Sequence, residues 1–177
     1  MTLTLGSEAP DFDLPGIDGS KHSLNDYAEA PALAVIWSCN HCPYVQAWES
    51  RMVEIQRDYA DRGVKVVAVS SNDAERYPED SFDEMKARAE RLRFNFDYLY
   101  DEDQSAAKAY GPERTPEVFL FDSDRKLVYH GAIDDSREED LVQRHHLREA
   151  IDAVVDGGEP AVAETPAVGC TVKWRGA

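Results

Sequence analysis

Apolar residues along this chain fall into two patterns, short continuous runs and stripes with helical spacing. The continuous runs cover 32–37, 64–69 and 118–121, and each is bounded by polar or turn-forming residues. Because these runs do not alternate with polar residues, they predict strands that are covered on both faces. A stripe with spacings of three and four residues follows the first run and predicts a helix that packs on the sheet and ends near Gly63. Its members are Val45, Trp48, Met52, Ile55 and Tyr59.

Turn and capping signals predict the remaining elements. Ser81 and Glu84 form a capping box for an inserted helix, and Ser136 and Glu139 give the same signal for the last helix. The other expected elements are a β-hairpin over 11–24, a charged linker over 75–80, a short strand over 96–100, a brief helix over 103–110 and a hairpin formed by 118–121 and 126–130. The expected core positions are Phe82, Met85, Ala89 and Leu92 in the inserted helix and Leu147, Ile151 and Val154 in the last one.

Strands that alternate with helices predict an α/β protein with a central sheet. The chain has 177 residues, a length that fits one domain with a sizeable core. We assign residues 1–157 to this domain, because Gly157 and Gly158 stop the last helix. Residues 158–177 are rich in proline and alanine and have no apolar period, so we expect an extended C-terminal tail, which carries Cys170.

The charge balance is strongly acidic. The chain has 35 acidic and 19 basic residues, for a formal net charge of −16, and the acids are spread along its whole length. Nucleic acids and anionic membranes would repel such a surface, so neither is an expected partner. Acidic residues on such a surface repel one another unless concentrated salt screens them, which indicates a halophilic protein. The alternative is an acidic mesophilic protein.

No apolar run reaches about 18 residues and 1–6 lacks the features of a signal peptide, so we expect a cytoplasmic protein.

The stretch 37–44 carries the chemistry. It contains Cys39, Asn40, His41 and Cys42, and it lies where a buried strand passes into a helix. A C-x-x-C pair at a helix start closes a small disulfide, and the positive helix end stabilises a thiolate there. We expect Cys39 to be the more exposed, attacking thiol and Cys42 the resolving thiol. A protonated His41 would favour the Cys39 thiolate.

Two other interpretations of the cysteine pair are weaker. A zinc site needs further ligands, but the chain has no second C-x-x-C, its third cysteine is Cys170, and His145 and His146 are adjacent. These two histidines are expected at the boundary or solvent side of the last helix. A purely structural pair is the second alternative. We expect no metal and no cofactor.

These motifs resemble the thioredoxin superfamily over about residues 6–157. Within it, the start at 6–14, the Cys-Asn-His-Cys motif and the tail at 168–174 resemble a peroxiredoxin-like redoxin family, often described as alkyl hydroperoxide reductase/thiol-specific antioxidant. The resemblance implies a thioredoxin fold with an N-terminal β-hairpin, a central mixed sheet flanked by helices, an inserted helix and the C-terminal tail. It also implies that Pro116 is a cis-proline opposite the active-site sulfurs, and that Trp37, Thr115 and Pro116 contact the substrate.

The chain departs from the family patterns at two positions. A peroxiredoxin motif has Thr or Ser three residues before its peroxide-reactive cysteine, which aligns with Cys42, whereas this chain has Cys39 there. The buried Asp that accepts protons in thioredoxin is replaced by Leu33 or a neighbouring apolar residue. Proton transfer is therefore expected to use His41 or water.

We therefore expect a thiol-disulfide oxidoreductase that acts through Cys39 and Cys42. Its partners would be a protein or small-molecule disulfide and a thioredoxin-type reductant. One alternative is a thiol peroxidase that reduces peroxides, and another is a copper- or metal-binding module that uses Cys39, Cys42 and His41. The tail is long enough to bring Cys170 to the pair, so Cys170 is a candidate third redox residue, with a passive structural thiol as the alternative.

Overall fold

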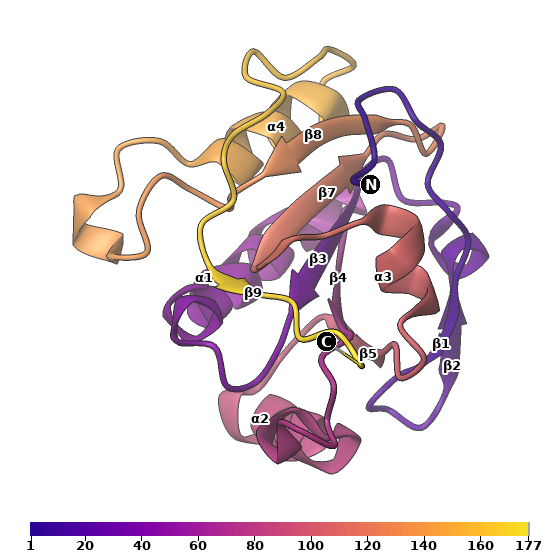
Figure 1. Cartoon of the computed structure of the whole chain (residues 1–177). Coiled ribbons are helices and arrows are strands. Elements are labelled where there is room, and N and C mark those ends of the chain that lie inside the picture. The colour runs from indigo at the N-terminus through magenta and orange to yellow at the C-terminus, as the bar shows by residue number, and fades with distance from the viewer. Residues whose placement is uncertain (177) are drawn as a thin grey trace.

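A mixed five-stranded sheet forms the centre of the computed structural model, which describes residues 1–176 (Figure 1). Its strand order is β5-β4-β3-β7-β8. The first three strands of this order are parallel and the last two pairings are antiparallel. The bounds are Leu33–Ser38 for β3, Lys65–Ser70 for β4, Asp97–Tyr100 for β5, Glu117–Phe121 for β7 and Leu127–Gly131 for β8.

Helices and a hairpin cover the two faces of this sheet. One face packs against α1 (Pro43–Tyr59), α2 (Phe82–Leu92) and α4 (His146–Val155), and the other against α3 (Ser105–Tyr110) and the β1–β2 hairpin. Strand β3 supplies both layers, because successive side chains point to opposite faces. Its Ala34 and Ile36 lie in the α1 layer, and its Leu33, Val35 and Trp37 lie in the α3 layer.

Most predicted elements are confirmed within a few residues. The hairpin pairs β1 (Asp13–Pro15) with β2 (Lys21–Ser23), and the whole predicted stripe of α1 is buried. In α2, the Ser81 side chain accepts the backbone N–H of Glu84, as the capping box requires. Leu92, however, is 40% exposed and does not belong to the core. Short 3-10 turns cover Leu24–Tyr27, Ala60–Arg62, Pro78–Asp80 and Glu139–Leu141.

The predicted start of the last helix is wrong. The capping signal at Ser136 leads only into the 3-10 turn, and α4 begins at His146. The reason is a tertiary contact, because the buried Arg51 guanidinium donates to the backbone carbonyls of Ser136 and Arg137 and to the Asp134 carboxylate. These contacts hold 134–137 against α1, before the start of α4.

The segment 75–80 is also more than a charged linker. It ends in the 3-10 turn Pro78–Asp80, and Asp80 has no exposed surface. This turn brings a carboxylate from beyond β4 to the start of α1, where Asp80 accepts the backbone N–H groups of Asn40 and His41. The consequence for the cysteine site is described below.

The C-terminal tail is extended, as expected, and is hydrogen-bonded to the body of the protein. In Figure 1 it runs in yellow from α4 past β7 to β9 (Cys170–Thr171). On the way, the backbone of His130 exchanges hydrogen bonds with Ala163 and Thr165. Strand β9 then pairs antiparallel with β6 (Arg114–Thr115), with Cys170 opposite Thr115. The final residue of the predicted tail, Ala177, lies outside the described residues.

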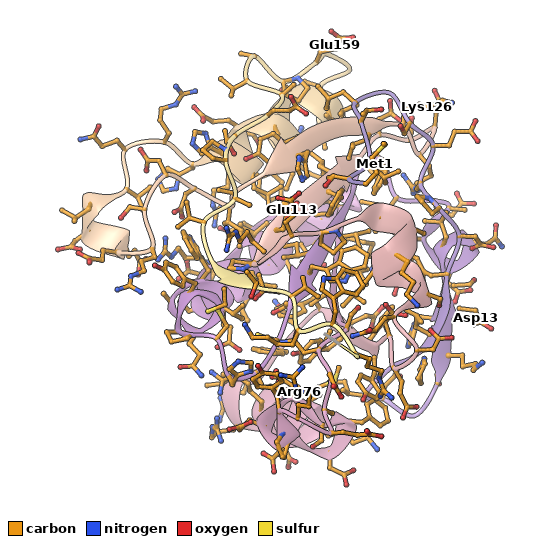
Figure 2. The ribbon with its side chains drawn as sticks, in the orientation of Figure 1. Met1, Asp13, Arg76, Glu113, Lys126 and Glu159 are labelled. Atoms are coloured by element: carbon orange, nitrogen blue, oxygen red, sulfur yellow. The ribbon has the colours of Figure 1, made fainter. Side chains whose placement is uncertain are left out.

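Charged side chains are distributed over the surface. Asp13 on β1 and Glu159 beyond α4 lie at distant edges of the molecule (Figure 2).

Within residues 1–176, no helix combines the length and apolar character needed to cross a membrane.

Candidate functional site

The C-x-x-C pair and the distant Cys170 meet at one end of the sheet. Cys39 follows the last residue of β3, Cys42 directly precedes α1, and Cys170 begins β9. The three side chains form one small apolar cluster with Val45. Cys39 is 1% exposed and Cys42 has no exposed surface, whereas Cys170 is partly exposed.

Cys42 occupies the N-cap of α1, because the helix begins at Pro43. The Cys39 thiol donates to its sulfur, as do the thiol and backbone N–H of Cys170 and the backbone N–H of Val45, and together they lower the pKa of Cys42 to about 4 despite its burial. The positive end of the helix acts in the same direction. These contacts favour ionisation of Cys42 over ionisation of Cys39.

Cys39 has the opposite environment. Its hydrogen bond to Cys42, its burial and the negative charge of Asp80 all raise its pKa well above the usual range. The expectation of an exposed Cys39 is wrong, because Cys39 is 1% exposed. The helix starts at Pro43, so its positive end faces Cys42, and a carboxylate from another segment contributes to the raised pKa of Cys39. Which of the two thiols attacks the substrate stays a prediction.

Asp80 organises the loop between the cysteines. Its carboxylate accepts hydrogen bonds from the Asn40 N–H, from the N–H and Nδ1 of His41 and from Asn72 Nδ2, at 2.5–3.1 Å. The His41 ring also stacks on Tyr77, with ring centroids 5.3 Å apart. The negative charge of Asp80 thus counters the charge that a protonated His41 would present to Cys39.

Thr115 and Pro116 lie against the sulfurs, and the bond between them is cis, as expected. The Cys42 thiol donates to the Thr115 carbonyl oxygen at 3.5 Å, and the Cys39 Sγ is 3.7 Å from the Thr115 hydroxyl. The buried Glu117 shapes this segment, because its carboxylate accepts the N–H groups of Glu113 and Arg114 at 2.8 Å and contacts His130 Nε2 at 2.6 Å.

Trp37 does not line the site, so its expected role in substrate binding is wrong. Its side chain has no exposed surface and packs against Tyr110 and Phe119 in the α3 layer. Its indole N–H donates to Ser71 Oγ at 3.0 Å. The alternation of β3 turns Trp37 away from α1 and into the core.

Sequence reasoning missed Asp80 and Glu117. Both are acidic residues in a chain with 35 of them, and nothing in their local sequence marks them as buried. Neighbouring residues do carry a signal, because Asp80 precedes a helix cap and Glu117 follows the Thr115-Pro116 dipeptide. Those signals indicate a turn and a strand start, and they do not indicate a buried carboxylate.

Cys39, His41 and Asp80 are the residues nearest to a metal-binding arrangement at this site. Each offers a ligand atom, and these atoms lie within 4.8 Å of one another. The Asp80 oxygens already accept four hydrogen bonds, one of them from the His41 ring. A bound metal would therefore have to displace donors that hold the loop.

Comparisons with known proteins identify the family of this chain. The profile of the AhpC/TSA family matches residues 5–130. The thiol-disulfide oxidoreductase ResA of Geobacillus thermodenitrificans is 28% identical over 127 residues, which make up 71% of this chain and 67% of that protein. The crystal structure of a hypothetical protein from Sinorhizobium meliloti 1021 is 39% identical, with a TM-score of 0.94, and covers 100% of this chain and 98% of that one.

A more distant structure identifies the fold. The thioredoxin domain of a thiol-disulfide oxidoreductase from Bacteroides vulgatus superposes with a TM-score of 0.63 at 19% identity, over 73% of this chain and 89% of that one. The mixed sheet flanked by helices is therefore a thioredoxin fold, which confirms the expected fold class.

Proposed function

The chain belongs to the AhpC/TSA family, and from this premise we propose that it exchanges disulfides through Cys39 and Cys42. Its ResA relative is a thiol-disulfide oxidoreductase, and this chain is an oxidoreductase of the same general kind. The observation that carries the proposal is the Cys42 sulfur, which lies at the N-cap of α1 and accepts the Cys39 thiol. A thiolate beside a thiol in a C-x-x-C is the arrangement that disulfide exchange requires.

In the reduced protein Cys42 is the nucleophile of the pair. Once Cys42 is joined to another sulfur in a mixed disulfide, the Cys39 thiol loses its proton and attacks the Cys42 Sγ. The Cys39–Cys42 disulfide forms, and the other sulfur leaves as a thiolate with the electron pair of the broken bond. Two electrons thus pass from the protein to the disulfide substrate, and an external dithiol of the thioredoxin type restores the reduced pair.

We assign the Cys39 proton to the His41–Asp80 pair. Ligand atoms of Cys39, His41 and Asp80 lie within 4.8 Å of one another, a distance that one water can bridge. His41 thus keeps its expected role as the proton acceptor, and Asp80 is its hydrogen-bond partner. The substrate would meet the Thr115–Pro116 segment, which lies against both sulfurs.

Turnover of a model disulfide tests this assignment. The reduced protein should reduce glutathione disulfide with formation of a Cys39–Cys42 disulfide, which peptide mapping detects. Cys42→Ser should abolish the reaction. Cys39→Ser should block turnover but still allow a Cys42 disulfide to form, and near-ultraviolet circular dichroism checks that each variant is folded. Full turnover by Cys42→Ser would overturn the assignment.

Peroxide reduction is a second candidate function, favoured by the low pKa of the fully buried Cys42 thiolate. A small peroxide would transfer one oxygen atom to Cys42 and release water or an alcohol. The Cys39 thiol would then attack the resulting sulfenic acid, which yields the same disulfide and a water molecule. Initial rates with hydrogen peroxide and with glutathione disulfide, measured on the same preparation, distinguish the two activities.

Metal binding by the same residues is a separate alternative that elemental analysis tests. Reduced protein purified with and without added Zn²⁺ or Cu⁺ should contain less than one equivalent of metal if the pair is a redox site. One tightly held equivalent that is lost in Cys39→Ser would favour a metal module. The hydrogen bonds already made by Asp80 count against it.

A further inference from the structure

The two sulfurs of the C-x-x-C are closed off from solvent. Cys39 is 1% exposed and Cys42 has no exposed surface. Attack on a disulfide requires the three sulfurs involved to approach in line, and a peptide or glutathione disulfide cannot do this at a sulfur without an accessible face. Among the described residues, Cys170 is the one cysteine that keeps partial exposure.

Cys170 lies directly against the buried thiolate. Both its thiol and its backbone N–H donate to the Cys42 sulfur. Thr115 explains this proximity, because its carbonyl contacts the Cys42 Sγ while its backbone pairs with Cys170 across the β6–β9 ladder. Paired residues in an antiparallel ladder have Cα atoms about 4.5–5.5 Å apart, so the side chain of Cys170 is held beside the segment that touches Cys42.

The tail around Cys170 is fitted to the body of the protein. A Cβ on Gly169 would lie 2.0 Å from the Thr115 carbonyl oxygen, so this position accepts only glycine while β9 is docked. Beyond β9, the Lys173 N–H donates to Asn72 Oδ1 and the Lys173 carbonyl accepts from the Asp73 N–H and Gln104 Nε2. The strand is thus anchored on both sides of Cys170, and the thiol is presented by a fixed strand.

We propose that Cys170 is the outer thiol of the site, through which external thiols and disulfides exchange with the buried Cys39–Cys42 pair. This inference rests on the proposed function and adds the route by which substrate reaches it. It also names the substrate class, which comprises thiols and disulfides too large to enter the space around Cys42.

The exchange has three balanced steps. The Cys170 thiolate attacks an external disulfide, the substrate S–S bond breaks, and one substrate sulfur leaves with the Cys170 proton. The Cys42 thiolate then attacks the Cys170 Sγ and releases the second substrate sulfur, which gives a Cys42–Cys170 disulfide. Finally Cys39 attacks the Cys42 Sγ, and Cys170 leaves and takes up the Cys39 proton. The protein loses two electrons and the substrate disulfide gains them.

The reverse direction follows the same route. An external thiolate attacks the exposed Cys170 end of the Cys42–Cys170 disulfide, and Cys42 leaves. The position of Cys42 suits that step, because Cys42 is the N-cap of α1 and the positive end of the helix stabilises the thiolate that leaves.

The first experiment identifies the sulfur that is attacked. The Cys39→Ala variant keeps only Cys42 and Cys170, and one equivalent of diamide should join them in a disulfide. A brief reaction with limiting glutathione, quenched in acid and mapped, should place glutathione on Cys170. Glutathione on Cys42, or failure of the two cysteines to form a disulfide, would overturn the proposal.

The second experiment distinguishes a Cys170 that exchanges disulfides from a tail that only shields the Cys39–Cys42 pair from solvent. In the otherwise wild-type protein, Cys170→Ser keeps the strand but removes the sulfur, so oxidation of the buried pair by glutathione disulfide should slow by about tenfold or more. Gly169→Ala keeps the sulfur but displaces the strand, and it should expose Cys42 to alkylation. If Cys170→Ser reacts as fast as the wild type or faster, the tail is only a cover and the proposal fails.

Oxidation by diamide distinguishes a failure of the proposed exchange function from a failure of the proposal for Cys170. Small oxidants such as diamide reach buried thiols, and they should still form the Cys39–Cys42 disulfide in Cys170→Ser. If they do not form it in the wild-type protein either, the exchange function itself is wrong. If they form it in both proteins while glutathione disulfide reacts equally with both, only the role of Cys170 is wrong.

Discussion

Nδ1 of His41 lies 2.5 Å from Oδ2 of Asp80, a carboxylate without exposed surface. This contact joins the loop between the two cysteines to a turn that lies about forty residues further along the chain. It also gives Cys39 a negative neighbour, which adds to the hydrogen bond to Cys42 and to burial in raising the pKa of Cys39. Asp80 is therefore a structural clamp that also acts on the Cys39 thiol.

Removal of the Asp80 carboxylate should destabilise the protein strongly. Asp80→Ala leaves the N–H groups of Asn40 and His41 and the Asn72 amide without their acceptor. Unsatisfied buried donors cost about 1–3 kcal/mol each, so we expect the free energy of unfolding to fall by roughly 3 kcal/mol or more. Urea denaturation measures the change. The adjacent Glu79→Ala, at an exposed position, is the matched control and should change it by less than about 0.5 kcal/mol.

The Cys42 thiolate should make the stability of the reduced protein depend on pH. The pKa of Cys42 is lowered to about 4 in the folded protein, whereas an unfolded cysteine titrates near 8.5. Between these values the unfolded state binds more protons, so the contribution of Cys42 to stability is present above the unfolded pKa and is lost as pH falls toward about 4.

This pH effect is measured against Cys42→Ser. The difference in unfolding free energy between the reduced wild type and the variant should grow in favour of the wild type from pH 5 to pH 8. Thiolate absorbance at ~240 nm, which needs no reagent to reach the buried sulfur, should report the same group, since thiolates but not thiols absorb there. A difference that stays constant over this range would show that Cys42 is protonated in the fold.

A buried ion pair should hold the loop before α4. Arg51 contacts Asp134 at 2.7 Å with both side chains almost fully buried. Arg51→Leu leaves the Asp134 carboxylate with an uncompensated charge and should lower the unfolding free energy by about 3–5 kcal/mol. Arg57→Leu removes an exposed partner of Asp58 on the same helix and should cost less than about 1 kcal/mol. Equal effects in chemical denaturation would contradict the assigned role of Arg51.

Docking of the middle of the tail should depend on Gly131. Its φ is +144°, and a Cβ there would lie 2.3 Å from the Thr165 carbonyl oxygen. Gly131→Ala should therefore displace 163–165 from β8 and lower the thermal midpoint. Gly19→Ala has a φ of +86° but no atom within 4 Å of the added Cβ, so it controls for backbone strain alone. Hydrogen exchange at the Thr165 amide, which donates to His130, should rise only in the Gly131 variant.

Salt should stabilise the protein. With a formal net charge of −16 spread over the surface, like charges repel at low ionic strength, and molar KCl reduces the screening length to about 3 Å. Thermal melts should shift upward from low to molar KCl. A triple change of exposed acids, Glu29→Gln, Glu102→Gln and Glu159→Gln, should reduce this shift. A flat series in the wild type would argue against a halophilic protein.

Local sequence patterns predicted an element correctly where residues close in sequence determine it. The stripe from Val45 to Tyr59 is the buried face of α1, because helical spacing alone places these side chains on one side. The capping box at Ser81 begins α2 because its hydrogen bond joins two residues only three positions apart. At Ser136 the same local signal fails, since Arg51 holds 134–137 against α1, before the start of α4.

The sequence by itself determined the α/β layers and the C-x-x-C at the junction of a strand and a helix, and its family resemblance implied the cis bond before Pro116. Tertiary structure alone decided the surroundings of the two thiols, because these depend on where the helix begins and on a carboxylate from Asp80. It likewise decided that Trp37 belongs to the core and that Cys170 meets Cys42. Electrostatic and packing contacts between residues distant in sequence follow from the folded chain, and no local period or motif encodes them.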